Sequence, residues 1–300
     1  KIRVAYYSAD FHNHATGHLI AELFELHDKS QFEFIGFSFG PITNDEMRQR
    51  LEKSFDQFIE VGHLTDQEIA TFSRSLQIDI AVDLGGFTVD NRPGVFALRV
   101  APVQMSYLGY LGTMGAPYYD YILADHTLIQ EKYRDSYTEK IIYLNSYQAN
   151  DTQRSIASKK FTREELNLPA TDFVFCCFNN NYKFTPETFD SWMRILKAVP
   201  NSILYLYADQ KVAQQNLCKE ASSRGVDSAR LIFGASLPRD QYLARYQTLD
   251  LFLDTLPYNA GTTASDALWA GLPVLTCAGN SLVSRMAASL LNAIELPELI

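Results

Sequence analysis

Short apolar segments alternate with amphipathic segments along the whole chain. Each apolar segment has the length and the unbroken hydrophobic character of a buried parallel strand. The segments between them carry apolar residues on one face, as Met47, Leu51 and Phe55 do, which predicts helices that pack on a sheet. The predicted strands cover residues 2–8, 32–39, a short segment at 59–61, 78–84, 103–108 and 121–124, and then 173–178, 202–207, 231–232, 251–253 and 273–276.

This alternation predicts an α/β protein with two mostly parallel sheets, each covered by helices on both faces. The pattern weakens after residue 143, where a polar stretch without a clear period follows. We therefore expect an N-terminal domain over residues 1–145, a linker over 146–171 and a C-terminal domain over 172–300. The chain begins without Met and stops in an apolar segment, so we expect a piece of a longer protein whose second domain is truncated.

Composition excludes some classes of function. The 26 basic and 35 acidic residues give a net charge of −9, with no run of Lys or Arg, which argues against nucleic-acid binding. No apolar run is long enough to cross a membrane. The four cysteines match no zinc-binding spacing, and we expect them to be reduced, as in a cytoplasmic protein.

Polar loops follow the predicted strands. Open parallel sheets bind ligands beyond the carboxyl ends of their strands, so loops at this position are candidates for a binding site. Two such domains would face a cleft between them. The candidate loops cover residues 10–18, 85–92, 109–115, 179–183 and 258–263.

The first of these loops contains His12, His14 and His18. A histidine here could hold a substrate hydroxyl or transfer a proton, because its pKa lies near neutrality. His14 and His18 are four residues apart, a spacing that metal ligands on a helix also use, but no Cys or Glu completes a known site. Packing against the start of a helix is the alternative for each of them.

The second half carries candidates for anion binding. Thr262 and Thr263 begin a predicted helix after Gly261, and free backbone N–H groups, two hydroxyls and the helix dipole converge there. One turn further, Asp266 could bind a ribose hydroxyl. Lys183 follows a strand directly and could pair with a phosphate. A capped helix and a solvated lysine are the alternatives.

The sequence contains no complete metal-binding motif. No two aspartates are separated by one residue, so the Asp-x-Asp pair that holds a divalent ion under a nucleotide diphosphate in many transferases is absent. A diphosphate leaving group would instead depend on Lys183, hydroxyl groups and the start of the helix at Thr262. We therefore expect neither a metal nor another cofactor.

These motifs together resemble the catalytic region of the O-GlcNAc transferase and SPINDLY family of protein O-glycosyltransferases, in its bacterial form. The resemblance extends over nearly all 300 residues, in the same order as in the family. Its motifs are the segment from Arg3 to Phe11 with Asn13, His14 and His18, the segment 101–113, the loop 178–183, and the stretch from Asp254 through Gly261-Thr262-Thr263 and Asp266 to Pro273.

The resemblance implies a GT-B architecture of two Rossmann-like domains and metal-independent transfer with inversion at the anomeric carbon. It implies that Lys183 binds the distal phosphate, that Thr262 and Thr263 bind the diphosphate, and that Asp266 holds the ribose. The remaining positions that it marks are Asn180 and Arg239 near the nucleoside, Gly261 before the threonine pair, Gly109 at the sugar, and His14 and His18 on the acceptor side, with His14 as a candidate general base.

The same resemblance implies a UDP-GlcNAc donor and protein Ser/Thr acceptors, presented by a tetratricopeptide region elsewhere in the full-length protein. The chain differs from members with a well-defined UDP-GlcNAc preference at three positions, namely Leu111, Arg239 and Gly261, where those members carry Pro, Lys and His. Transfer of fucose from GDP-fucose or of glucose from UDP-glucose is therefore an alternative. A catalytically silent module that binds partners is another, although it would have no need for a phosphate site.

Overall fold

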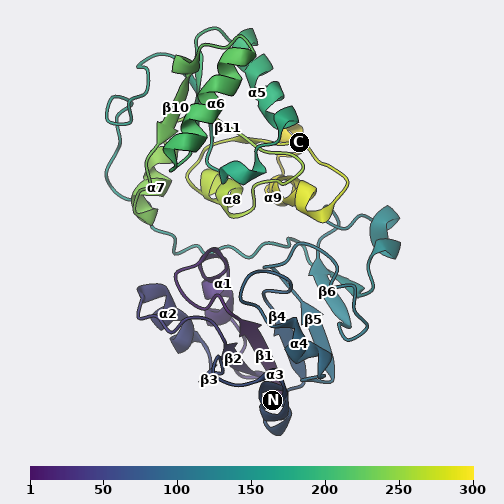
Figure 1. The fold of residues 1–300 in the computed structure, drawn as a ribbon. Coiled ribbons are helices and arrows are strands. Elements are labelled where there is room, and N and C mark those ends of the chain that lie inside the picture. The colour runs from purple at the N-terminus through teal and green to yellow at the C-terminus, as the bar shows by residue number, and fades with distance from the viewer. The chain divides into compact units, whose positions relative to one another are not determined.

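The computed structural model describes residues 1–300 as two compact units, Lys1–Gln153 and Arg154–Ile300 (Figure 1). Each unit is a parallel sheet with helices packed on it, as the alternating pattern predicts. The division between the units falls inside the segment 146–171 that the sequence marks as a linker.

The first unit is built on a seven-stranded parallel sheet with the order β3-β2-β1-β4-β5-β6-β7. The strands are β1 (Ile2–Ser8), β2 (Phe32–Ser38), β3 (Gln57–Glu60), β4 (Ile80–Asp83), β5 (Val103–Ser106), β6 (Tyr121–Ala124) and β7 (Lys140–Tyr143). The helices are α1 (Ala15–Glu25), α2 (Glu46–Ser54), α3 (Asp66–Ser75), α4 (Pro93–Ala97) and the 3-10 helix η1 (Glu131–Ser136).

Strand β7 and helix α4 are absent from the sequence prediction. β7 is a four-residue edge strand whose residues are half-buried or exposed, so it lacks the apolar run that identifies the inner strands. α4 is only five residues long, too short to show helical periodicity. Helix α3 begins at a capping box, which Thr65 and Glu68 form.

The second unit has a five-stranded parallel sheet with the order β10-β9-β8-β11-β12. The strands are β8 (Phe173–Cys177), β9 (Ser202–Tyr207), β10 (Leu231–Gly234), β11 (Leu251–Leu253) and β12 (Val274–Leu275). The helices are α5 (Pro186–Ala198), α6 (Lys211–Ser223), α7 (Arg239–Tyr246), α8 (Thr262–Trp269) and α9 (Met286–Ala293), with short 3-10 helices at Asn181–Lys183, Ser228–Arg230, Leu282–Arg285 and Pro297–Leu299.

In each sheet the direction in which successive strands are added changes once, and we call the place between the two central strands the reversal point. In the first sheet β1 and β4 are neighbours, and the chain proceeds outward from them in opposite directions; β8 and β11 have the same relation in the second sheet. Since the loops after two such strands diverge to opposite faces, a crevice opens between them, and this is where open α/β sheets bind ligands. The topology therefore indicates that a ligand would bind at the loops after β1, β4, β8 and β11.

The segment expected as a linker is packed on both sides of the division. Within the first unit, Asp151 is buried and binds the guanidinium of Arg50 at 2.5 Å. Within the second unit, Ile156 and Leu168 pack in the hydrophobic core around β8. Parts of the segment 146–171 are thus packed into one unit or the other. No helix combines the length and the apolar character needed to span a bilayer.

Candidate functional site

The candidate residues fall into two groups, one at the reversal point of each sheet. His14 follows β1, whereas Lys183 follows β8 and Thr262 follows β11.

The loop after β1 turns sharply and ends at the cap of α1. His12 N–H donates to the carbonyl of Asp10 at 2.8 Å, and His14 N–H donates to the carbonyl of His12 at 2.6 Å. His14 is the N-cap residue of α1, and its Nδ1 accepts from the backbone N–H of Thr16 at 3.3 Å. Asp10 Oδ1 lies 3.5 Å from the same Nδ1. A histidine and a carboxylate therefore share the start of this helix.

A pocket of about 460 Å³ opens at this reversal point. It brings His14 together with Gly109 from the loop after β5. A Cβ at Gly109 would lie 2.0 Å from the carbonyl oxygen of Leu84, so only glycine allows this close approach of the two loops. The residues that line the pocket are Ala9, Asp10, His12, His14, Thr16, Pro41, Thr88, Val89, Asp90 and Gly109.

His18 is not among the residues that line this pocket. It lies one turn inside α1, where its Nε2 is 2.7 Å from Oδ1 of Asn13. The acceptor-side role of His18 stays a prediction. Neither His18 nor the other histidines belong to a group of three or more His, Cys, Asp or Glu side chains that could hold a metal ion.

Lys183 lies at the reversal point of the second sheet, close to the loop after β11. Its Nζ donates to the carbonyl of Asn259 at 3.1 Å and lies 3.9 Å from the centre of the Tyr258 ring. Burial lowers the pKa of Lys183, and the nearby carboxylate of Asp254 opposes this shift. Asn180 caps the short 3-10 helix that carries Lys183, accepting from Tyr182 N–H at 3.4 Å. The loop thus positions an ammonium group that is only partly hydrated.

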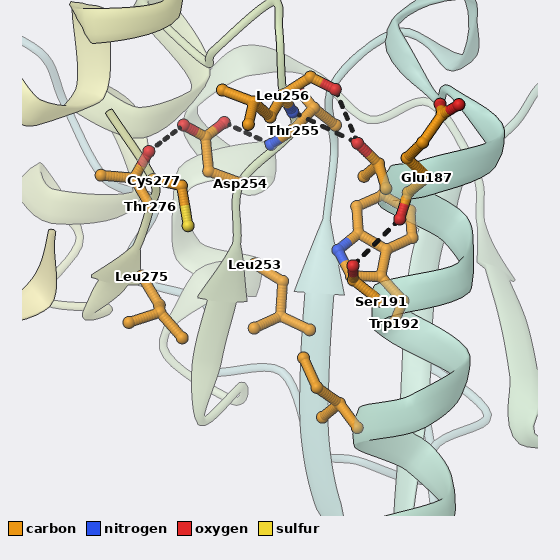
Figure 2. A pocket seen from close by; sticks show the side chains of 12 residues that line it. Glu187, Ser191, Trp192, Leu253, Asp254, Thr255, Leu256, Leu275, Thr276 and Cys277 are labelled. Carbon is orange, nitrogen blue, oxygen red and sulfur yellow. Dashed lines mark hydrogen bonds between the residues drawn. The ribbon is translucent and has the colours of Figure 1, made fainter. Parts of the chain in front are cut away.

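Asp254 organises this region, although it was not among the residues predicted to bind the donor. It follows β11 directly and accepts from the backbone N–H groups of Thr255 and Ala260 and from the hydroxyl of Thr276, each at 2.7 Å. Figure 2 shows the contacts with Thr255 and Thr276. Burial raises the pKa of Asp254 to about 6, while these hydrogen bonds and Lys183 oppose the shift. A carboxylate directly after an apolar strand was the available sequence signal.

The hydroxyl groups of the two threonines at the start of α8 differ in their hydrogen bonds. Thr263 donates its hydroxyl to Oδ1 of the buried Asn179, whose Nδ2 donates to Thr255 Oγ1 at 2.8 Å. The hydroxyl of Thr262 has no partner in the protein, and no side chain caps the helix at Gly261. The first-turn N–H groups of α8 and the Thr262 hydroxyl are therefore available to an anion.

Asp266 lies one turn into α8 and is held by two arginines. Arg239, at the start of α7, donates to Oδ1 at 3.0 Å, which brings together two residues that the sequence assigned to the nucleoside. Arg154 donates to the same oxygen at 2.9 Å and stacks on Trp269, with 4.9 Å between its guanidinium carbon and the ring centre. Burial raises the pKa of Asp266, and the two arginines oppose the shift. No sequence signal pointed to Arg154.

A second pocket, of about 230 Å³, lies beside the loop after β11 (Figure 2). It is formed by α5, β11 and β12, and among its lining residues are Trp192, Leu253, Asp254 and Cys277. Its walls contain none of the residues predicted to bind the donor, although it shares Asp254 with the group around Lys183.

Comparison with known proteins gives consistent matches over the whole chain. The family described as Glycosyl transferase family 41 matches residues 1–158 and 145–300. A protein of Arabidopsis thaliana named probable UDP-N-acetylglucosamine–peptide N-acetylglucosaminyltransferase SEC is 33% identical over 296 residues, which cover 97% of this chain and 30% of that protein. A Caenorhabditis elegans protein named UDP-N-acetylglucosamine–peptide N-acetylglucosaminyltransferase is 25% identical over 413 aligned residues, covering 100% of this chain and 36% of that protein.

Among solved structures, an O-GlcNAc transferase mutant from Thermobaculum terrenum superposes with a TM-score of 0.90 at 33% identity. The match covers 100% of this chain and 57% of that one. The predicted fold class, a GT-B-like pair of parallel-sheet α/β domains, is confirmed. The chain spans about a third of the length of the two curated relatives.

Proposed function

Because the chain belongs to glycosyl transferase family 41, we propose that it is the catalytic region of a protein O-glycosyltransferase. The proposed reaction moves N-acetylglucosamine from UDP-GlcNAc to Ser or Thr hydroxyls of proteins, as the names of the relatives suggest. The full-length protein would present its acceptors through a tetratricopeptide region, and we expect it to act in the cytoplasm.

The observation that carries the proposal is the arrangement at the reversal point of the second sheet. An ammonium group, the free hydroxyl of Thr262 and the uncapped start of α8 all come from the loops after β8 and β11. A diphosphate is the anion that such a set suits, because it offers several charged oxygens at once. The carboxylate of Asp266 and the guanidinium of Arg239 are close enough to each other to serve one ribose and its base.

The proposed chemistry needs no metal ion. As the bond between the anomeric carbon and the phosphate oxygen breaks, negative charge develops on the leaving diphosphate. Lys183 and the N-terminal end of α8 would stabilise that charge, because both are already oriented before the reaction starts. The Asp254 carboxylate acts on Lys183 at a distance by favouring its charged form.

The acceptor hydroxyl would attack the anomeric carbon from the side opposite the phosphate, which inverts the configuration. His14 would accept the proton of that hydroxyl as general base. Gly109 would leave room for the sugar, since no side chain projects from the loop at this point.

The experiment that tests the function combines binding with transfer. The chain is titrated with UDP and with GDP by calorimetry in the presence of EDTA, and transfer from UDP-GlcNAc to a Ser/Thr peptide is then measured by mass spectrometry. We expect tighter binding of UDP than of GDP, and transfer that EDTA leaves unchanged. Tighter binding of GDP would favour a fucose donor, loss of transfer with EDTA would contradict the metal-free mechanism, and binding of neither nucleotide would favour a silent module.

A further inference from the structure

The loop between β1 and α1 holds one carboxylate that the proposed mechanism does not use. Asp10 lines the same pocket as His14 and is largely shielded from solvent, with 15% of its side chain exposed against 44% for His14. Its backbone N–H donates to Ser8 Oγ at 2.9 Å, which fixes the turn. Shielding a carboxylate from water disfavours its charged form, so its place beside a candidate base suggests that it has a role there.

The next residue, Phe11, anchors the loop. Its side chain is 1% exposed and lies among the rings of Phe24, Phe55 and Phe58, with ring centres 5.6 to 6.1 Å away. With Phe11 packed into the core, Asp10 is left on the side of the loop that faces the pocket. The position of Asp10 is therefore set by core packing and the Ser8 contact, and does not depend on His14.

The Nδ1 atom of His14 lies between a donor and an acceptor. The backbone N–H of Thr16 is 3.3 Å away, and Asp10 Oδ1 is 3.5 Å away. An unprotonated Nδ1 can accept from Thr16, whereas a protonated Nδ1 can donate only to the carboxylate. Nδ1 therefore has a partner in either state, and in the neutral tautomer that is protonated at Nδ1 the Nε2 atom is free to accept a proton.

We infer that Asp10 is a positioning residue for His14, so that Asp10, His14 and the acceptor hydroxyl form a relay of the kind found in hydrolase triads. This inference rests on the proposed function. The hydroxyl oxygen forms its bond to the anomeric carbon while the bond to the leaving diphosphate breaks, and the diphosphate keeps the electron pair. In the reactive tautomer the ring proton is on Nδ1, so Nε2 of His14 is unprotonated and takes the hydroxyl proton. The Nδ1–H group of the resulting imidazolium donates to Asp10, which stays ionised.

Other charged groups face this pair. His12 lies on the same loop, with 5.7 Å between its ring centre and that of His14, and Asp90 lines the pocket from the loop after β4. Asp45, at the start of α2, interacts with His12. Burial raises the pKa of Asp10 and Asp90 adds to this, while His14, His12 and the Thr16 hydroxyl oppose it. The histidines thus favour the ionised Asp10 that the relay needs.

The test compares Asp10→Asn, His14→Ala and the double variant with the wild-type chain. Asp10→Asn keeps the size of the side chain but removes its charge. We expect kcat to fall about 10- to 100-fold and the acidic limb of the kcat/KM profile to move to lower pH, because an imidazolium without its counter-charge loses its proton more easily. In the His14→Ala background, Asp10→Asn should have no further effect on kcat. Additive losses would overturn the inference.

A second measurement does not depend on activity. Titration of the His14 imidazole by NMR should show a lower pKa in Asp10→Asn than in the wild type, and a largely retained pKa in Asp10→Glu. Asp90→Asn, which removes a charge from the same pocket without a contact to His14, should shift the pKa less than Asp10→Asn does. Equal pKa values in the wild type and Asp10→Asn would overturn the inference.

The two proposals fail in different ways. If the wild-type chain transfers no sugar, the proposed function fails, whereas transfer that Asp10→Asn leaves unchanged would remove only the role of Asp10. Thermal unfolding of each variant serves as the folding control. Asp10 lies in the first unit and the proposed nucleotide residues in the second, so the affinity for UDP should be the same in all variants.

Discussion

Lys183 is a cation held largely out of water with no carboxylate in direct contact. Its polar partner is a carbonyl oxygen of Asn259, its other neighbour is the ring of Tyr258, and Asp254 acts on it only through space. Such an environment weakens the hydration of the ammonium group without replacing it by an ion pair. An anionic ligand would supply the missing charge, which is why a structural lysine is the poorer interpretation.

Replacing Lys183 by alanine should abolish transfer while the fold survives. We expect kcat to fall by about 100- to 1,000-fold, the loss typical when one pre-oriented group that stabilises developing charge is removed. The melting temperature should stay close to that of the wild type, because the side chain makes a single hydrogen bond. The measurements are turnover and thermal unfolding, with Lys219→Ala on the exposed face of α6 as the control. A Lys183→Ala variant with wild-type turnover would remove the phosphate role.

Asp254 should make the stability of the protein depend on pH. Its pKa is raised from the ordinary 3.8 to about 6, so its protonated form stabilises the folded state below 3.8 and this contribution is lost as the pH rises through about 6. The loss amounts to about 3 kcal/mol at most. The free energy of unfolding of the wild type relative to Asp254→Asn should therefore fall over this range in urea titrations.

The comparison with Asp254→Asn is needed because Asp10, Asp83 and Asp266 also have raised pKa values and contribute in the same direction. Taking the difference between the two proteins at each pH removes these shared contributions. A difference that stays constant from about pH 4 to about pH 7 would show that Asp254 is ionised throughout, in conflict with its burial.

At the scale of elements, the first turn of α8 combines a residue that is bonded within the protein with one that is proposed to bind the donor. The hydroxyl of Thr263 is used within the protein, where it fastens α8 to Asn179 at the end of β8. The hydroxyl of Thr262 is free, and it projects from a helix end that no side chain caps. Two adjacent threonines, indistinguishable in the sequence, are therefore expected to respond differently to the same substitution.

Valine keeps the shape of threonine and removes only the hydroxyl. Thr262→Val should weaken UDP binding by about 10-fold without loss of stability, since one hydrogen bond to a charged group contributes roughly 1.5 kcal/mol or more. Thr263→Val should lower the free energy of unfolding by about 1–3 kcal/mol, because it leaves the buried Asn179 carbonyl unpaired. Calorimetry and urea unfolding of both variants provide the test, and each variant is the control for the other. Equal changes in UDP affinity and in free energy of unfolding for the two variants would contradict the different roles of Thr262 and Thr263.

At the scale of the whole molecule, the proposed nucleotide residues all belong to the second unit. Arg154, the first residue of that unit, contacts one of them. Arg154 binds Asp266 and Ser265 and lies on Trp269, so the site depends on a residue that precedes β8 by almost twenty positions. Ile156 and Leu168 extend the core of the same unit. The proposed nucleotide site and the N-terminal segment of the unit are thus parts of one folded body.

Fragments that differ only in this segment should therefore differ in binding. We expect residues 154–300 to bind UDP with an affinity within about 10-fold of the full chain, and residues 172–300 to bind at least about 10-fold more weakly, because Asp266 loses one of its two cations in a buried position. Calorimetry measures the UDP affinity of both fragments. Arg154→Met in the full chain should weaken UDP binding in the same way, because it removes the same cation from Asp266. Equal affinity of the two fragments would show that Arg154 has no part in the site.

The sequence by itself determined the α/β class, most strands and the loops that carry the candidate residues. It could do so because buried parallel strands are unbroken apolar runs, and because turn residues, caps and short motifs are local signals. Lys183 after β8 and the threonine pair at α8 were recognisable on this basis. The short edge strand β7 and the five-residue helix α4 were not, because neither is long enough to show a period.

Only the tertiary structure decided which side chains act together. Arg154 reaches Asp266 across 112 residues, Thr263 reaches Asn179 across 84, and Asp254 interacts with Lys183 from another strand. Asp10 and His14 are close in sequence, yet their contact depends on Phe11 being packed in a core formed by distant segments. Burial, charge coupling and hydrogen-bond partners depend on positions in space, and a local pattern of residues does not contain them.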